Sequence, residues 1–229
     1  MWTKIVVVFI FGGLVGLDTT AAWQVLFSHP LFACSLLGLA FGEPQLGIFF
    51  GIIFELVWLH DLPVGGARFP EGNQSSFVGL MLVLTFLPQS GIAMPWLVLF
   101  SCIYAVIVAY LFSVTISLMR RLNFYFVKRA DRYAQAGEAK GIERMHLLAL
   151  LHTYFHGAVW GLFFYLVGFA LLKPLLTRLP ATALFQLAHL QAIFLGVGLA
   201  IMGKLFFSRR KIHYLISGLI CGVGLATLF

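Results

Sequence analysis

The residues of this chain are arranged in blocks: long apolar runs follow one another, with short polar stretches between them. An α-helix needs about 20 residues to cross the hydrocarbon core of a bilayer. Runs of roughly that length or more occupy residues 5–27, 92–119, 147–172, 182–207 and 212–228. Backbone polar groups in lipid must be satisfied within the segment, and the apolar residues do not alternate with polar ones as in membrane barrels. The pattern therefore predicts membrane-spanning helices.

The first third of the chain is less regular. Residues 30–42 and 44–60 are apolar but short, about 20 Å and 26 Å of helix against a hydrocarbon core of about 30 Å. Gly42 and Pro44 stand between them, and Pro44 suits the first turn of a new helix. Residues 76–87 are also short. Such interrupted segments are typical of discontinuous helices around a transporter binding site, although two ordinary tilted helices with a tight turn would give the same pattern.

These segments predict an all-α, polytopic integral membrane protein with about six to eight helical segments, including short discontinuous or re-entrant segments in the first third. We treat residues 1–229 as one membrane-embedded domain, with discontinuous helices and a candidate substrate hairpin within residues 28–88. Lys4 and the apolar run after it resemble a signal peptide, but no convincing cleavage site follows and more spans do. We expect a retained first helix.

Composition agrees with a membrane protein, because 61% of the residues are hydrophobic and only 10% are charged. The formal charge of +7 is distributed unevenly along the chain. Residues 120–144 carry seven Lys/Arg and residues 204–211 form a second basic cluster, whereas residues 173–181 between them hold few charges. The positive-inside rule predicts that 120–144 is a cytoplasmic basic loop and that 173–181 lies outside. Topology, with some attraction to anionic headgroups, therefore explains the charge without a nucleic-acid partner.

Cysteine and histidine spacing contains no recognisable metal or redox motif. The three cysteines lie far apart in apolar segments without C-x-x-C spacing, which indicates buried packing. His152 and His156 are one helical turn apart, which suits a pair of metal ligands, a proton relay or simple helix-interface packing. The chain has no Walker motif and no nucleotide fingerprint. We expect no cofactor and no metal.

Two glutamates flank an apolar stretch that contains regularly spaced glycines. Gly47, Gly51 and Glu55 fall at i, i+4 and i+8, nearly one face of a helix, and Glu43 begins the same row. Glycines at this spacing let another helix approach closely, so Glu55 is predicted to face protein. An ionisable group in an apolar segment is a functional candidate by default, although it can also pair with a base or a backbone amide. Glu43 can instead be a carboxylate at a helix N-terminus.

A polar stretch, residues 60–76, follows directly. It contains carboxylates, amides and a guanidinium, with Trp58 and Phe69 as neighbouring aromatic rings. Such a stretch is either a plain loop or a re-entrant segment that lines a cavity. Hydroxyl-rich ligands need bidentate donors and acceptors together with a flat apolar face. The stretch is therefore a candidate ligand site.

Residues 29–76 resemble the membrane component, enzyme IIC, of the mannose/fructose/sorbose family of the bacterial phosphotransferase system. The resemblance rests, without gaps, on His29-Pro30-Leu31, Gly42-Glu43, Gly47, Gly51, Glu55, Leu59-His60, Gly66-Ala67 and Pro70-Glu71. A second match, Ala130-Asp131 followed by Gly137 or Gly141 and then His146, is similar to a cytoplasmic loop of that family. Together the matches cover about 140 residues, and the later helices agree only in number and placement.

The resemblance implies a hexose permease subunit in a bacterial plasma (inner) membrane. Its implied partners are the enzyme IID membrane subunit and the cytoplasmic IIA and IIB proteins, in a trimeric assembly with an elevator-like movement. IIB would phosphorylate the sugar, so this chain would need no catalytic nucleophile, and whether it counts as an enzyme stays open. Glu55 would accept sugar hydroxyls, with the 60–76 stretch forming the adjacent hairpin. The candidate substrate-binding residues are Glu55, Asp61, Asn73, Glu43, Gln24, His60 and Arg68.

Some positions differ from the family pattern. Trp23 and Gln24 stand where the family has an acidic residue, with Asp18 further back, and His29 replaces an arginine. His60 replaces a glycine, and Arg68 lies in a stretch that the family keeps small and neutral. These differences leave alternatives open: a diverged non-transporting or regulatory homologue, a membrane enzyme or sensor, or an ion-coupled secondary transporter using Glu55, His152 and His156.

Overall fold

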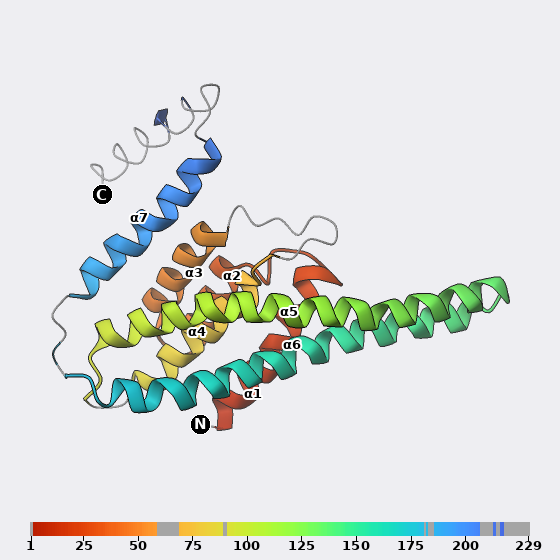
Figure 1. Cartoon of the computed structure of the whole chain (residues 1–229), viewed down its shortest axis with the longest axis horizontal. Coiled ribbons are helices and arrows are strands. Elements are labelled where there is room, and N and C mark those ends of the chain that lie inside the picture. Colours follow the sequence, from red (N-terminus) through yellow and green to blue (C-terminus); the bar gives the residue numbers. More distant parts are fainter. Residues whose placement is uncertain are drawn as a thin grey trace.

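The computed structural model describes residues 2–58, 69–88, 91–180, 182, 186–206, 213, 216 and 217. The described residues form helices and no strand (Figure 1), which confirms the all-α prediction. Three helices, α1, α5 and α6, are long and apolar enough to cross a membrane, and several shorter apolar helices accompany them. The chain is a multi-pass membrane protein. In order, its helices are α1 (Trp2–Thr20), α2 (Pro30–Ala40), α3 (Pro44–Trp58), α4 (Gly72–Phe86), α5 (Met94–Gln135), α6 (Ala139–Leu176) and α7 (Leu187–Phe206).

Helices α5 and α6 form a long antiparallel hairpin that defines the long axis of the molecule (Figure 1). They contain 42 and 38 residues, about 63 Å and 57 Å of helix, roughly twice the thickness of a hydrocarbon core. Residues 120–144, expected to be a cytoplasmic basic loop, are helical except at residues 136–138, and their cytoplasmic location stays a prediction. Lysine, arginine and glutamate are good helix formers, so charge alone does not end a helix. The turn comes at Gly137, where φ is +71°.

Helices α2 and α3 form a tight hairpin at the predicted break. Gly42 has a φ of +77°, and the Glu43 N–H donates to the Gly38 carbonyl over 2.7 Å, before Pro44 begins α3. The glycine row of α3 packs against α2: a Cβ on Gly47 would come within 2.5 Å of the Cys34 carbonyl oxygen. A Cβ on Gly51 would come within 2.9 Å of Leu31 Cα. The predicted close approach of another helix is therefore confirmed, and that helix is α2.

Helix α4 forms the centre of the core, with α1, α2, α3, α5 and α6 packed around it. Nearly every one of its side chains is buried, as expected for a short helix without a polar face. Gln74, near its start, donates from Nε2 to the Gly12 carbonyl of α1 over 2.8 Å. A Cβ on Gly157 of α6 would come within 2.5 Å of the same Gly12 oxygen. The first turn of α4 therefore lies deep among α1, α5 and α6.

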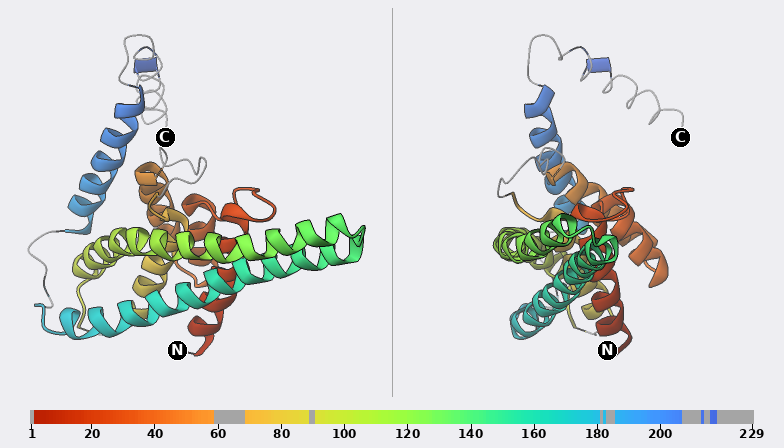
Figure 2. Two further views of the ribbon diagram at one scale, coloured as in Figure 1. Left: turned by 45° about the vertical axis from the view of Figure 1, so that its right-hand side comes forward. Right: turned by 90° about the vertical axis from the view of Figure 1, so that its right-hand side faces the viewer.

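Helix α7 packs against α3, where a Cβ on Gly198 would come within 2.7 Å of Leu56. Figure 2 shows it at one side of the bundle formed by the other helices. It agrees with the apolar run predicted at residues 182–207. The last predicted run, residues 212–228, lies almost entirely outside the described residues.

Candidate functional site

The segment at residues 21–29 joins α1 to α2 in an unusual conformation. Trp23, Gln24 and Leu26 have φ values of 64°, 50° and 68°, in the left-handed region that residues with a side chain seldom adopt. The buried Asp18 carboxylate holds this segment, because it accepts the backbone N–H groups of Val25 at 2.9 Å and of Ser28 at 2.7 Å. Strained backbone held by its surroundings is a common feature of functional sites.

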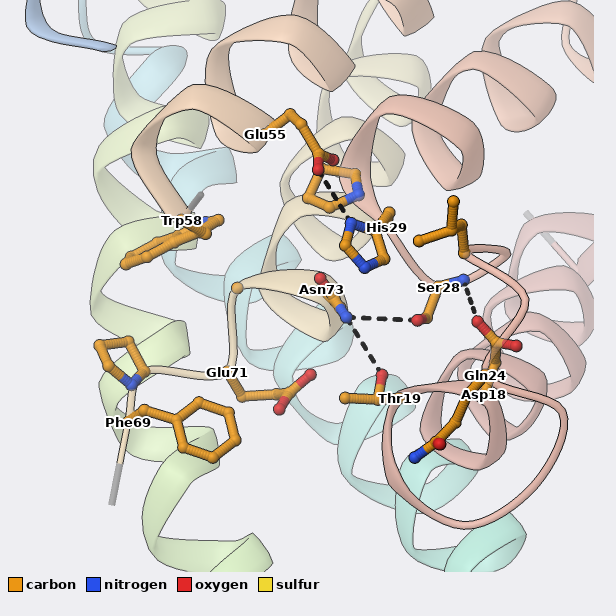
Figure 3. A pocket seen from close by; sticks show the side chains of 14 residues that line it. Asp18, Thr19, Gln24, Ser28, His29, Glu55, Trp58, Phe69, Glu71 and Asn73 are labelled. Atoms are coloured by element: carbon orange, nitrogen blue, oxygen red, sulfur yellow. Dashed lines mark hydrogen bonds and ion pairs between the residues drawn. The ribbon is translucent and has the colours of Figure 1, made fainter. Parts of the chain in front are cut away.

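This segment forms one wall of a cavity of about 310 Å³. The other walls are the end of α1, the end of α3 and the residues that lead into α4 (Figure 3). The volume is at the small end of the range for ligand sites, about 300–1,000 Å³. Its lining is Asp18, Thr19, Gln24, Leu26, Ser28, His29, Pro30, Glu55, Trp58, Phe69, Pro70, Glu71, Gly72 and Asn73.

Glu55 reaches from α3 to the beginning of α2. Its Oε1 lies 2.8 Å from His29 Nδ1, and its Oε2 accepts the backbone N–H of Leu31 over 3.2 Å. The first N–H groups of a helix have no partner within the helix and favour negative charge. Glu55 therefore holds the start of α2 and also lines the cavity. The sequence left a structural and a functional role open, and the geometry is compatible with both.

Asn73, in the first turn of α4, joins two other segments across the cavity. Its Nδ2 lies 3.3 Å from both Thr19 Oγ1 of α1 and Ser28 Oγ of the 21–29 segment, and donates to each. The Thr19 hydroxyl in turn donates to the Val15 carbonyl over 2.8 Å. One side chain thus fixes the mutual position of α1, α4 and the connecting segment, as the dashed lines in Figure 3 show.

Glu71, directly before α4, has a different environment. Its backbone N–H donates to the Ala109 carbonyl of α5 over 2.9 Å, and its side chain is 1% exposed. Among the described residues, neither carboxylate oxygen makes a hydrogen bond of standard geometry, and the Gln74 N–H and the Arg120 guanidinium are the groups that favour its charged form. A buried polar group without a partner typically costs 1–3 kcal/mol, and a charged one costs more. A ligand that donates hydrogen bonds into this cavity would remove that cost.

Aromatic rings lie on the side of the cavity away from Asp18 and Gln24 (Figure 3). They belong to Trp58 at the end of α3 and to Phe69. A Cβ on Gly72 would come within 2.3 Å of the Trp58 ring, so glycine is required for the ring to lie against the backbone there. Carboxylates, hydroxyls and an amide opposite aromatic faces suit a neutral ligand with many hydroxyl groups.

The predicted site residues have three different outcomes. Glu55, Asn73 and Gln24 converge on this cavity, although they come from three separate elements. Glu43 lies at the other end of α3, about 18 Å along the helix from Glu55, and does not line the cavity. His60, Asp61 and Arg68 lie outside the described residues. Their binding roles stay predictions.

The prediction missed residues that the cavity brings together. Asp18 and Glu71 both line it, and Asp18 supplies the carboxylate that the sequence around Trp23 and Gln24 lacks. A signal for Asp18 was present, because it is an ionisable residue within an apolar run, as Glu55 is. Thr19 and Ser28 carry no such signal, since single hydroxyls are common in membrane helices and loops.

The paired histidines of α6 do not join Glu55 in this cavity. His152 Nδ1 lies 2.6 Å from Asn123 Oδ1 of α5, and the His156 ring packs edge-on against Phe112 at 6.1 Å between ring centroids. Neither histidine is among the cavity's lining residues. The part of the chain that the structure describes contains no group of three or more His, Cys, Asp or Glu side chains placed to hold a metal ion.

Comparison with known families and proteins finds relatives of one kind. The family model described as "PTS system sorbose-specific iic component" matches residues 2–227. The fructose permease IIC component of Bacillus subtilis (strain 168) is 32% identical over 152 residues, 66% of this chain and 54% of its own. The sorbose-specific EIIC component of Lacticaseibacillus casei is 30% identical over 150 residues, 65% of this chain and 50% of its own. The chain thus spans about half the length of these curated relatives.

Solved structures with the same fold cover nearly the whole chain. One, titled "Structure of membrane protein", has a TM-score of 0.73 at 22% identity and covers 100% of this chain and 92% of its own. Another, a cryo-electron microscopy structure of the mannose transporter ManYZ with microcin E492, has a TM-score of 0.63 at 21% identity and covers 97% and 87%. At these identities the likeness concerns the fold alone.

Proposed function

The chain belongs to the family of sorbose-specific IIC components of the phosphotransferase system, and we propose that it is the sugar-permease subunit of a mannose-family system. In this proposal it binds a hexose in the cavity between α1, α3 and α4, and moves the sugar inward. A cytoplasmic IIB partner then phosphorylates the sugar. The observation that carries the proposal is the buried Glu71 carboxylate, which lines the cavity without a hydrogen bond of standard geometry among the described residues.

The chemistry of the lining supports a neutral sugar as the ligand. Three carboxylates, those of Asp18, Glu55 and Glu71, line the cavity, and His29 is its only basic side chain among the described residues. Carboxylates accept hydrogen bonds from hydroxyl groups and repel anions in a medium of low dielectric constant. A hexose satisfies this lining, whereas a hexose phosphate would meet repulsion. The site therefore favours the substrate over the phosphorylated product.

The depth of the cavity supports inward delivery. The Glu71 backbone N–H donates to the carbonyl of Ala109, which lies in the middle of the apolar part of α5. The end of α1 lines the second cavity together with Arg120, where the basic part of α5 begins. By the positive-inside rule that basic part faces the cytoplasm. The cavity then extends from near the bilayer midplane, where transporters commonly bind substrates, toward the cytoplasmic side. A cytoplasmic phosphoryl donor could reach a sugar there.

The remaining parts of the proposal concern partners and location. We propose that an enzyme IID subunit accompanies this chain in a bacterial plasma membrane, with IIA and IIB proteins supplying the phosphoryl group, in a trimeric assembly. Support for the IID and other phosphotransferase partners comes from the family match and from the structural likeness to the mannose transporter. Large apolar side chains remain exposed on α2, α5 and α6 of the single chain, where lipid or membrane partners can cover them.

Uptake of labelled mannose, fructose and sorbose tests the proposal in cells that lack their own hexose permeases. The cells express this chain with its IID, IIA and IIB partners, as wild type, Glu71→Gln or Glu43→Gln. Each lost hydrogen bond to a charged group costs about 1.5–3 kcal/mol, so Glu71→Gln should lower sugar-phosphate accumulation about tenfold or more. Glu43→Gln is the matched control, because Glu43 lies outside the cavity, and should transport like wild type.

Membrane insertion of every variant is measured alongside uptake. No uptake of any of these sugars by a well-inserted wild type with its partners would overturn the permease proposal. Uptake without IIA and IIB would instead favour the ion-coupled alternative, in which free sugar accumulates. Equal sugar-phosphate accumulation by wild type and Glu71→Gln would show that Glu71 does not bind the sugar.

A further inference from the structure

A second cavity, of about 390 Å³, lies next to the first, between the end of α1 and the α5–α6 hairpin. The two cavities share Thr19 and Gln24, so the end of α1 and the 21–29 segment separate them. Apart from these two shared residues, the second cavity is distinct from the proposed hexose site. It is lined by Thr19, Thr20, Ala21, Gln24, Met119, Arg120, Asn123, Phe124, Val127 and Thr153.

The charge of the second cavity is opposite to that of the first. Among the described residues, Arg120 is its only charged lining side chain, and no carboxylate lines it. Hydroxyl and amide side chains also line this cavity, from Thr19, Thr20, Gln24 and Asn123. An arginine presents several N–H donors in a planar fork that matches the oxygens of a phosphate group. The lining is therefore suited to a phosphate ester with further hydroxyl groups.

Contacts on the hairpin hold these groups in place. Asn123 Nδ2 donates to Thr153 Oγ1 over 3.2 Å, and Asn123 Oδ1 lies 2.6 Å from His152 Nδ1. The Arg120 guanidinium carbon lies 5.6 Å from the centroid of the Phe69 ring, which belongs to the first cavity. Arg120 is thus positioned beside the hexose site, at the side of the second cavity. Arg120 also interacts electrostatically with the buried Glu71 carboxylate of the first cavity. A guanidinium has five N–H donors, so an arginine that already has one interaction can also bind a phosphate group.

We propose that this second cavity binds the phosphate group of the hexose monophosphate after the sugar has been phosphorylated. The inference rests on the proposed function, and it gives the phosphorylated product a binding site separate from that of the hexose. A neutral hexose is accommodated among the carboxylates of the first cavity, and its phosphate ester is repelled there and attracted toward Arg120. Thr19 and Gln24 contact both spaces and so lie on the path between them. The change of charge on phosphorylation would then oppose return of the product.

Equilibrium binding of labelled mannose 6-phosphate and of labelled mannose tests this inference on the full chain with its IID partner in nanodiscs. Losing a charge-assisted bidentate contact should weaken mannose 6-phosphate binding about tenfold or more in Arg120→Gln. Arg120→Lys keeps the positive charge but loses the planar guanidinium, so its mannose 6-phosphate affinity should lie between those of wild type and Arg120→Gln. Arg121→Gln is the matched control, since Arg121 is exposed on the same helix and lines neither cavity. It should bind like wild type.

Mannose binding in the same samples separates the two proposals. Retained mannose binding with no mannose 6-phosphate binding by wild type would overturn the product site alone, and the reverse would overturn the hexose site alone. Equal weakening by Arg120→Gln and Arg121→Gln would also overturn the product site. Glycerol 3-phosphate and inorganic phosphate are the competing probes: if glycerol 3-phosphate competes as well as unlabelled mannose 6-phosphate, the cavity recognises a lipid-type headgroup and the assignment to a hexose phosphate fails.

Discussion

Two neighbouring cavities of this protein share Thr19 and Gln24 and yet differ in almost every other respect. The first is lined by three carboxylates and two aromatic rings, and it lies between the end of α1, the end of α3 and the start of α4. The second is lined by an arginine and several neutral polar groups and is built against the long α5–α6 hairpin. In a medium of low dielectric constant the sign of a few charges decides which ligand is accepted. Adjacent spaces can therefore favour a neutral sugar and its anionic ester.

The two cavities also differ in what keeps them open. The first depends on close backbone contacts, such as Gly47 against α2, and on polar contacts between segments far apart in the chain, such as Asn73 with Thr19. The second depends on side-chain contacts along one hairpin, such as Asn123 with Thr153. A substitution at a contact that supports one cavity should weaken ligand binding there alone, and a substitution at a contact that supports both should weaken binding at both.

The largest effect is expected for Asp18→Ala, because Asp18 holds the segment that separates the cavities. The change leaves the backbone N–H groups of Val25 and Ser28 without their acceptor, at about 1–3 kcal/mol for the buried Ser28 group and less for the part-buried Val25 group. Binding of mannose and of mannose 6-phosphate should therefore both fall about tenfold or more. The matched control is Asp131→Ala, an exposed acidic position on α5. A selective loss of only one ligand would show that the segment does not support both spaces.

The next effect is expected for Gly47→Leu, which should damage the first cavity and leave the second. A side chain at Gly47 meets the backbone of α2 at Cys34 and Gly38, so it would push the α2–α3 hairpin apart. Overpacking of this kind costs about 1–3 kcal/mol, and it should displace Glu55 from His29. The unfolding temperature and the mannose affinity should both fall, and the mannose 6-phosphate affinity should stay nearly unchanged.

Gly196→Leu is the control for this change, because a Cβ on Gly196 meets no heavy atom within 4 Å in the structure. It should unfold at the same temperature as wild type and bind both ligands normally. An equal loss of mannose 6-phosphate binding in Gly47→Leu would show that the cavities form one cooperative unit.

The smallest effect is expected for Trp58→Leu, which removes an aromatic face from the first cavity and no charge from either. Loss of an aromatic contact is worth about 0.5–1.5 kcal/mol beyond buried area, so mannose affinity should fall roughly twofold to tenfold. Trp2→Leu is the matched control, since Trp2 is exposed near the other end of α1. A change in mannose 6-phosphate affinity as large as that for mannose would contradict the separation of the two sites.

Much of the fold was predictable, because it follows from interactions within a few residues. The break at Gly42 and Pro44 depends on a left-handed glycine and on the missing proline N–H, both local properties of the backbone. The close contact of Gly47 and Gly51 with another helix follows from helical periodicity. Residues 120–144 were expected to be a loop and are helical except at residues 136–138, because charged residues continue a helix well.

The site was less predictable, because its residues meet only in the packed structure. The sequence by itself determined the membrane helices, their breaks and the placing of Glu55 on a protein-facing row, since each depends on chain sterics, hydrophobicity and periodicity. Only the tertiary structure decided that Asp18 and Glu71 join Glu55 in one cavity, and that Arg120 stands in the next. Those positions depend on how α1, α4 and α5 pack against one another across long separations in the chain, and that packing also sets the sign of charge in each cavity.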